Sequence, residues 1–389
     1  MSGREPSRLG QFVETTASGE RVRAFLPPPL PPIPPLNLQG FFTLYDTARG
    51  AVGRLDGVTT ILPSTPLFLY MYVRKEALLS SQIEGTQSSL ADLLLFELEQ
   101  APGVPADDVV EVSNYVAALT HGLDRLREGF PFSTRLLREI HGVLLAKGRG
   151  ADKAPGEFRR SQNWIGGPRP GQAHFVPPPP GAVGDAMAEL ERFLHDRTVR
   201  PPELIRAGLA HVQFETIHPF LDGNGRVGRL LITLWLCQAG ILREPLLYLS
   251  LYLKQHRAEY YRRLDLVRSD GDWEAWLRFF LEGVRQTADG AVTAARQLVV
   301  LFGEDRERVQ AKGRLAGSAL RVHEALQARP VTTLTAIRAR TGLSFPAVAA
   351  GMGALADLGI ARELTGRKRD RVFAYDRYLA ILQEGTEPL

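Results

Sequence analysis

The residues best equipped for chemistry lie close together at positions 218–229, in the stretch HPFLDGNGRVGR. They include an imidazole (His218), a carboxylate (Asp222) and the guanidinium groups of Arg226 and Arg229. His218 is the natural general base, because the unperturbed pKa of histidine, about 6.5, lies close to working pH. Asp222 offers the hard oxygen ligand that suits Mg²⁺, the usual companion of polyphosphates. Together these side chains predict a site that grips the phosphates of a nucleotide and moves one of them.

The residues around these groups predict a helix that begins inside the motif. An apolar run over residues 230–237 ends near Gly240, which is typical of a buried helix with a glycine just beyond its end. Residues 223–226 then form the helix N-terminus, where free backbone N–H groups and the helix dipole favour anions. Three glycines allow the backbone to approach a phosphate closely. They are Gly223, Gly225 and Gly228.

Each of these residues alone is more often structural, and their combination at this spacing carries the prediction. Residues 218–229 match, at every specified position, the motif His-x-Phe-x-(Asp/Glu)-Gly-Asn-Gly-Arg-x-x-Arg of Fic-domain proteins. The chain thus resembles a family composed mostly of protein adenylyltransferases. The resemblance implies that His218 deprotonates a hydroxyl group of a target protein, which then attacks the α-phosphate of ATP.

The same resemblance assigns the other residues of the motif. It implies that Asp222 holds Mg²⁺ and that Phe220 anchors the loop in the core. Gly225 stands where the related Doc phosphotransferases carry a lysine, so transfer of AMP is favoured over transfer of the γ-phosphate. The implied nucleotide-binding residues are Gly223, Asn224, Gly225, Arg226, Val227, Gly228 and Arg229.

A second motif, SSQIEG, lies well upstream. Ser80 and Glu84 are four residues apart, so they share one face of a helix predicted to begin near residues 64–66 and to end at Gly85. The segment resembles the inhibitory signature (Ser/Thr)-x-x-x-Glu-(Gly/Asn) of the Fic family. That resemblance implies that Glu84 pairs with Arg229 and occupies the space of the γ-phosphate, which makes the chain autoinhibited. Taken alone, the same six residues would be a solvated glutamate beside a helix end.

Two further segments have roles that the resemblance implies. Residues 156–176 predict a short β-hairpin, and in Fic proteins a hairpin here is a flap that aligns the backbone of the target. An ordinary surface hairpin is the alternative. A helix beginning near Ser250 carries Tyr260 and Tyr261. The resemblance implies an aromatic residue of the adenine pocket here, with Tyr261 preferred to Tyr260, although both also suit a core.

The C-terminal residues predict a winged helix-turn-helix domain, in which a third helix over residues 344–359 would enter the major groove of DNA. Residues 344–361, however, contain no Lys, Arg, Asn or Gln to read a base edge. The predicted wing, residues 365–370 between strands over 360–364 and 371–375, is basic enough for only one or two phosphate contacts. A module that recruits the target or self-associates is therefore preferred, and many family members with this appendage form dimers.

The chain has 389 residues, which is long for one core and predicts two or three domains. The expected fold is mainly α: a Fic-type helical bundle with a β-hairpin flap, followed by a small α/β winged helix-turn-helix domain. From about residue 107 to residue 300 the flap is the only convincing β-structure expected. The predicted divisions are an N-terminal region with a proline-rich stretch and the inhibitory helix (1–105), a catalytic domain (106–300), a helical linker (301–317) and the winged helix-turn-helix domain (318–389).

Composition limits the cellular setting. The chain has 47 basic and 43 acidic residues, a net charge of +4, which does not by itself indicate nucleic-acid binding. Its single cysteine, Cys237, excludes a disulfide framework within the chain and indicates a reducing compartment. No apolar run is long enough to cross a bilayer and the N-terminus has no signal-like apolar segment, so a cytoplasmic protein without membrane contact is expected.

These features predict a protein adenylyltransferase that uses ATP with Mg²⁺, modifies an unknown target protein or itself, and forms a homodimer. Two alternatives stay open. One is a DNA-binding regulator whose Fic core senses a nucleotide without transferring it. The other is a Fic enzyme that removes AMP or transfers a different nucleotide.

Overall fold

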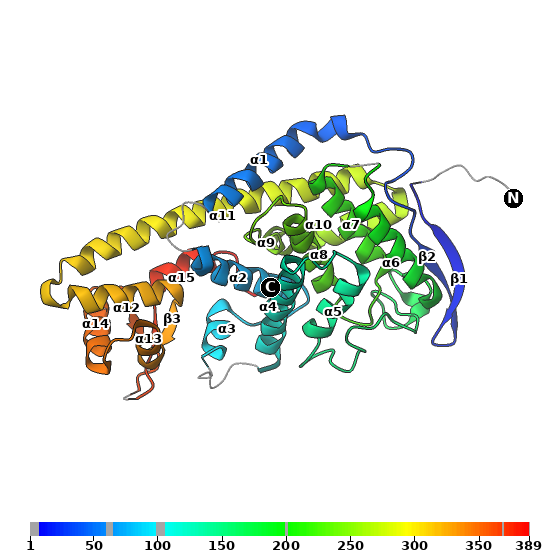
Figure 1. The fold of residues 1–389 in the computed structure, drawn as a ribbon. Helices are drawn as coiled ribbons and strands as arrows, with labels where there is room; N and C mark the ends of the chain where they lie inside the picture. The colour runs from blue at the N-terminus through cyan, green and yellow to red at the C-terminus, as the bar shows by residue number, and fades with distance from the viewer. Residues whose placement is uncertain (1–7, 60–64, 99–105, 199–200, 368, 389) are drawn as a thin grey trace.

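The structure, a computed structural model, describes residues 8–59, 65–98, 106–198, 201–367 and 369–388. Helices dominate, which confirms the mainly α fold predicted from the sequence. The longest helix, α11 (Trp273–Gln310), runs from the central bundle to the C-terminal helices, and α1 (Phe42–Val58) lies along it (Figure 1). Across these ranges, no helix combines the length and the apolar character that a bilayer-spanning segment needs.

The centre of the bundle is the pair α7 (Glu203–Ile217) and α8 (Asn224–Gln238), which contact α2, α4, α5, α6, α10 and α11. Both helices are buried along nearly their whole length, which explains why residues 230–237 of α8 are almost entirely apolar. The helix predicted to carry the inhibitory motif is α2, which ends at Ile83. Its start is predicted near residues 64–66, of which residue 64 lies outside the described residues. The other elements are η1 (Leu38–Phe41), α2 (Thr65–Ile83), α3 (Leu90–Phe96), α4 (Ala106–Arg127), α5 (Thr134–Leu144), η2 (Pro170–Gln172), α6 (Pro180–His195), α9 (Ser250–Gln255) and α10 (Arg257–Asp270).

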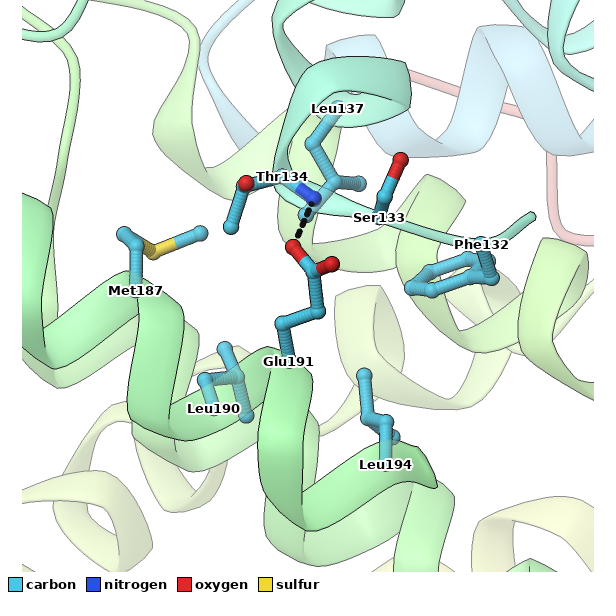
Figure 2. Close-up of a pocket in the computed structure, with 8 residues that line it drawn as sticks. All are labelled: Phe132, Ser133, Thr134, Leu137, Met187, Leu190, Glu191 and Leu194. Atoms are coloured by element: carbon cyan, nitrogen blue, oxygen red, sulfur yellow. Dashed lines mark hydrogen bonds between the residues drawn. The ribbon is translucent and has the colours of Figure 1, made fainter. Parts of the chain in front are cut away.

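The beginning of α5 is fixed by two side chains. Ser133 Oγ accepts a hydrogen bond from the backbone N–H of Leu136 (3.3 Å). Glu191 of α6 accepts one from the backbone N–H of Thr134 (2.7 Å; Figure 2). Two of the N–H groups that a helix start leaves free are thereby satisfied, and α5 is tied to α6. This matters for the site, because α5 carries a histidine that supports the motif loop.

The N-terminal residues form a β-hairpin that the sequence does not predict. β1 (Gln11–Ala17) pairs antiparallel with β2 (Glu20–Leu26) over all seven residues of each strand. Ser18 and Gly19 join them with φ angles of 48° and 82°, as the tightest hairpin turns require. This hairpin precedes residues 107–300, the range over which the flap is expected to be the only convincing β-structure.

The apolar face of this hairpin is small, which is why the alternation of its sequence is a weak signal. Ala17, Val22 and Ala24 are buried together with Val176, which follows the flap. The backbone N–H of Phe25 donates to the carbonyl oxygen of Val176 (2.9 Å). The hairpin thus covers the flap from one side, a tertiary contact that local sequence cannot reveal.

The flap itself is smaller than the hairpin predicted over residues 156–176. Its β-structure consists of one isolated bridge between Ile165 and Phe175. Two prolines in the intervening loop have no N–H groups to donate to a longer ladder, and η2 occupies part of that loop.

The C-terminal region contains a small three-stranded antiparallel sheet with the strand order β3-β5-β4. The strands predicted over 360–364 and 371–375 correspond to β4 and β5, whereas β3 and α15 are not predicted. Residue 368 of the predicted wing lies outside the described residues. Much of the predicted linker belongs to α11, where buried Asp305 accepts a hydrogen bond from Tyr375 (2.6 Å). The elements are η3 (Gly313–Leu315), α12 (Ala316–Ala328), β3 (Val331–Thr333), α13 (Leu334–Thr341), α14 (Phe345–Asp357), β4 (Arg362–Glu363), β5 (Val372–Ala374) and α15 (Asp376–Gln383).

Candidate active site

The chain turns sharply at His218, the residue that ends α7. His218 has a left-handed backbone conformation (φ 49°, ψ 60°), and its N–H donates to the carbonyl oxygen of Phe214 (2.9 Å). This conformation is uncommon for a residue other than glycine and persists only where the surroundings impose it. Burial lowers the pKa of the imidazole to about 3, and the positive charges of Arg268 and Arg159 add to the effect. The ring is therefore neutral near pH 7 and able to accept a proton.

Arg159 holds the backbone of this turn, a role that the sequence does not predict. Its backbone N–H donates to the carbonyl oxygen of Pro219 (2.9 Å), and its Nε donates to the carbonyl oxygen of His218 (2.9 Å). Nη2 donates to the carbonyl oxygen of Pro178 (2.5 Å). Arg159 is only 2% exposed, so these carbonyl groups accept the hydrogen bonds that water accepts from an exposed guanidinium. Arg159 thereby fixes the direction in which the His218 side chain leaves the backbone.

The loop after His218 is closed by Asn224. The backbone N–H of Phe220 donates to Asn224 Oδ1, and Asn224 Nδ2 donates to the carbonyl oxygen of Phe220, both at 2.8 Å. Phe220 is fully buried, as its predicted role of core anchor requires. The side-chain amide of Asn224 therefore shapes the loop in this structure.

His141 of α5 supports the same loop from the other side and is also absent from the sequence-based prediction. Its ring stacks on Phe220, with 3.8 Å between centroids and an angle of 6° between planes. The backbone N–H of Gly156 donates to Nδ1 (2.8 Å), so the proton of the neutral ring lies on Nε2, which donates to the carbonyl oxygen of Asp222 (3.1 Å). Burial lowers the pKa of His141 to about 4, which keeps this ring neutral.

The N-terminus of α8 presents free backbone donors. Gly223 precedes the helix with a φ of 76°, and the first bond of the helix runs from the N–H of Val227 to the carbonyl oxygen of Gly223 (3.0 Å). The N–H groups of residues 224–226 come before that bond and have no helical acceptor. The side chain of Val227 is fully buried, so only its backbone belongs to the site. A helix start of this kind binds anions.

The two arginines of the motif are buried against acidic partners. Arg226, 2% exposed, lies 3.4 Å from Glu111 of α4 and 3.8 Å from Asp222. Arg229, also 2% exposed, is held by the upstream motif: its Nη2 donates to Glu84 Oε1 (2.7 Å).

The upstream motif meets the α8 start directly. Arg229 Nε donates to Ser80 Oγ (2.7 Å), and Nη2 also donates to the carbonyl oxygen of Ser80 (2.9 Å). A Cβ atom added to Gly225 would lie 2.3 Å from Glu84 Oε1. The Glu84 carboxylate therefore occupies the space above the helix start, where an anionic ligand would bind. Gly85 follows with a φ of 101°, a conformation suited to glycine.

Comparison with known proteins agrees with this arrangement. The Fic/DOC family N-terminal domain matches residues 42–124, and the Fic/DOC family domain matches residues 131–236. The chain therefore carries the two domains of the Fic/DOC family.

The similar proteins include the protein adenylyltransferases Fic of two insects. The chain is 38% identical to that of Drosophila sechellia over 212 residues, 53% of this chain and 39% of the relative. It is 33% identical to that of Culex quinquefasciatus over 255 residues, 62% of this chain and 47% of the relative. The chain thus spans less than half the length of these relatives. A solved Fic family protein from Desulfovibrio desulfuricans G20 shares the fold, with a TM-score of 0.53, 20% identity, and coverage of 85% of this chain and 95% of that chain.

In this Fic chain the two tyrosines of α10 have different surroundings. Tyr260 is 1% exposed, and its hydroxyl donates to His211 Nε2 (2.9 Å), because His211 Nδ1 donates to the carbonyl oxygen of Gly228 (2.8 Å). Tyr261 is 38% exposed, with the Arg257 guanidinium 5.4 Å from its ring centre. Of the two side chains, only Tyr261 is accessible to a ligand.

Asp222 is the carboxylate of the Fic motif that could hold a metal ion. Its side chain is 30% exposed, and its Oδ1 accepts a hydrogen bond from the N–H of Gly223 (2.6 Å). Within the described ranges, no cluster of three or more His, Cys, Asp or Glu residues could form a complete metal site. Mg²⁺ at nucleotide sites needs only one or two protein carboxylates, since phosphate oxygens and water fill its other positions. Asp222 therefore fits a Mg²⁺ that arrives with a nucleotide.

Glu215 of α7 is a residue of the site that the sequence-based prediction missed. It is 7% exposed, and a Cβ atom added to Gly228 would lie 2.2 Å from its Oε1. Burial raises the pKa of Glu215 to about 7, although the charge of Arg229 opposes the shift. Its position in the last turn of α7, three residues before His218, is the one signal that could have indicated it.

Proposed function

We propose that this chain is a protein adenylyltransferase, which transfers AMP from ATP to a hydroxyl side chain of a target protein or of itself. The observation that carries the proposal is the meeting of His218, Asp222 and the free N–H groups of α8 at one loop, beside Arg229. The insect relatives that are named protein adenylyltransferase Fic support the same reaction.

In the proposed reaction, the N–H groups of residues 224–226 bind the α- and β-phosphates, and Arg226 and Arg229 bind the rest of the triphosphate. The target hydroxyl oxygen attacks the α-phosphorus as His218 takes the hydroxyl proton. The new P–O bond forms while the bond to pyrophosphate breaks, and pyrophosphate leaves. The negative charge of the bound nucleotide raises the pKa of His218 from its low value, which makes the ring a better base.

Asp222 would hold Mg²⁺ with the nucleotide, and the bond from the Gly223 N–H to Asp222 Oδ1 orients the carboxylate for this task. The bound ion supplies positive charge that neutralises phosphate oxygens. Tyr261 would line the adenine pocket, since its ring is accessible whereas that of Tyr260 is buried.

We also propose that Glu84 inhibits this reaction. Its carboxylate accepts a hydrogen bond from Arg229 and fills the space above Gly225, so a γ-phosphate in a productive position would collide with it. ATP could then bind only in a pose that blocks in-line attack. Ser80 orients the arginine through its hydroxyl and its carbonyl oxygen.

The C-terminal region, in this proposal, is a winged helix that recruits the target or joins two copies of a cytoplasmic homodimer. Its helix α14 exposes Phe345, Ala350 and Gly353 and contains no basic or amide side chain. This surface does not favour readout of DNA bases, so DNA binding is the weaker alternative.

The test compares wild type, Glu84→Gly and Glu84→Gly/His218→Ala, each incubated with Mg²⁺ and ATP labelled on the α- or the γ-phosphate. Self-modification is the readout, so the target need not be known. We expect label from the α-phosphate only, strongest in Glu84→Gly and lost in the double variant. Label from the γ-phosphate would mean phosphotransfer, and activity that survives without His218 would contradict the proposed base.

A further inference from the structure

The segment that follows α15 lies against the end of α2 that carries the inhibitory motif. Four successive backbone carbonyl groups of this segment, residues 384–387, accept hydrogen bonds from side chains of α2 and α9. Lys75 Nζ donates to Glu384 (3.0 Å), and Gln82 Nε2 donates to Thr386 (2.8 Å). Lys254 Nζ donates to Gly385 (3.2 Å) and to the carbonyl oxygen of Glu387.

These three donor side chains are deeply buried, so residues 384–387 bind at an internal site and not at the protein surface. Lys75 is 3% exposed, Gln82 0% and Lys254 5%. A buried ammonium group is costly unless acceptors surround it, and the carbonyl groups of residues 384, 385 and 387 supply them. The burial also lowers the pKa of Lys75 to about 8. The buried lysines therefore need the carbonyl groups of residues 384–387 as acceptors, just as these residues need the lysines as donors.

The segment is shaped for this place. Thr386 is 4% exposed, and its N–H and hydroxyl both donate to the carbonyl oxygen of Gln383 (2.9 and 2.7 Å). Gly385 has a φ of 76°, and a Cβ atom there would lie 2.5 Å from a side-chain carbon of Leu251. A larger residue at position 385 is thus opposed both by the backbone conformation and by the neighbouring side chain.

Gln82 connects the binding site of residues 384–387 to the SSQIEG motif, because it lies between Ser80 and Glu84 in the sequence. Its Oε1 accepts a hydrogen bond from Lys254 (2.7 Å), and its Nε2 donates also to the carbonyl oxygen of Ser88 (3.0 Å). The backbone N–H of Gly85 donates to the carbonyl oxygen of Gln82 (3.0 Å). The turn that places Glu84 on Arg229 is therefore built on a residue that the segment holds.

We propose that residues 384–387 are a latch that keeps the end of α2 in its inhibitory position, so that release of this segment frees Glu84 from Arg229. The effect of this latch on activity rests on the proposed function. The docking of residues 384–387 against α2 and α9 is a separate claim that hydrogen exchange can test. The latch links the C-terminal region to the site, since α15 precedes the segment directly. A partner that binds the C-terminal region and pulls the segment away would raise activity.

The test uses the full chain with Gly385→Val, which should expel the segment without touching α2, His218 or Arg229. The matched control is Gly366→Val, because Gly366 also has a positive φ (62°) but has no heavy atom within 4 Å of its added Cβ. Two readouts are taken: self-modification with α-labelled ATP, and hydrogen exchange of the amides of residues 80–88, whose N–H groups at 84–86 are bonded within the turn.

We expect Gly385→Val to raise self-modification about 5- to 30-fold, the range of a moderate coupling between two sites, and to speed exchange over residues 80–88. Gly366→Val should match wild type in both readouts. In the Glu84→Gly background, Gly385→Val should add little, because the inhibitor is already gone.

The outcomes separate the latch from the proposed reaction. If Glu84→Gly transfers AMP while Gly385→Val leaves either readout at the wild-type level, the latch is overturned. If no variant transfers AMP, exchange alone decides: faster exchange in Gly385→Val supports the latch and leaves the proposed reaction wrong, and unchanged exchange overturns the latch as well.

Discussion

Two glutamates from different helices lie beside the same arginine, Arg229, and they are held in opposite ways. Glu84, at the end of α2, is 29% exposed and bonds the guanidinium directly at 2.7 Å. Burial alone would raise its pKa, but the charge and the hydrogen bond of Arg229, together with the charge of Arg226, lower it. Glu215, near the end of α7, is 7% exposed, and its Oε1 has no hydrogen-bond partner among the described residues. Its pKa is raised to about 7.

The difference shows that proximity to a guanidinium does not by itself offset the cost of burying a carboxylate, and that a direct hydrogen bond adds to the attraction at Glu84. It also separates two roles. Glu84 sits at the accessible edge, where an incoming phosphate could take its place on Arg229. Glu215 is enclosed beside Gly228 and belongs to the fixed frame of the loop. The end of α2 is thus the replaceable part of the site, and the end of α7 is the permanent part.

The largest expected effect tests the permanent part through Glu215→Gln. The folded-state pKa of about 7 lies above the ordinary value of 4.5, so the folded chain keeps a proton that the unfolded chain releases. The stability of the wild type therefore falls as pH rises from about 4.5 to about 7, by about 3 kcal/mol at most. Glutamine is neutral throughout, so the variant should be more stable than wild type by up to about that amount at pH 8 and by about 1 kcal/mol or less at pH 5.

Denaturant unfolding at the two pH values measures this difference. The matched control is Glu128→Gln, the same substitution at a side chain that is 65% exposed in the wild type. A gain of the same size at both pH values would mean that the carboxylate of Glu215 is already paired and that the contrast with Glu84 is false.

The replaceable part is tested by Glu84→Gly. A hydrogen bond between charged groups contributes about 1.5–3 kcal/mol, so its loss should raise self-modification about 10- to 100-fold. Glu84→Gln keeps the shape and a neutral acceptor, and its activity should lie between those of wild type and Glu84→Gly. The three rates with α-labelled ATP decide the matter. Equal rates in wild type and Glu84→Gly would leave Glu84 without an inhibitory role.

How far the sequence predicts this site depends on how local each contact is. Residues 218–229 are contiguous, so their spacing alone placed the base, the carboxylate and the helix start in one loop. The pairing of Glu84 with Arg229 spans 145 positions and was implied only by a resemblance to a known motif. His141 and Arg159 escaped prediction because they act on backbone carbonyl groups of the loop, and a carbonyl group carries no sequence signal.

The fold shows the same limit. The long helices follow from apolar periodicity, but the hairpin β1–β2 depends on a small cluster with Val176 that forms only in three dimensions. Tyr260 and Tyr261 are neighbours in the sequence, and only the packing around α10 decides that the first is buried and the second exposed. Local patterns therefore predicted the elements, and tertiary neighbours decided which side chains reach the site.

A smaller effect is expected from Ser80→Ala, which removes the hydroxyl that accepts from Arg229 Nε at 2.7 Å. One hydrogen bond contributes about 1 kcal/mol, so self-modification should rise about fivefold, well below the effect of Glu84→Gly. Ser81→Ala is the matched control, because the buried Ser81 hydroxyl has no hydrogen-bond partner among the described residues. If Ser81→Ala activates as much as Ser80→Ala, general loosening of α2 and not the orientation of Arg229 explains both.

The smallest effect concerns pH. Arg229 lowers the pKa of Glu84 in spite of burial. The Glu84–Arg229 pair is therefore fully formed above the ordinary carboxyl pKa of about 4.5 and is lost only as pH falls through the lowered folded-state pKa. The ratio of Glu84→Gly to wild-type self-modification should therefore stay constant between pH 6 and pH 8, even where both rates change through His218. A ratio that falls toward one on acidification to pH 6 would mean that Glu84 takes up a proton in this range. Glu84 would then resemble Glu215, and the distinction between the replaceable and the permanent carboxylate would fail.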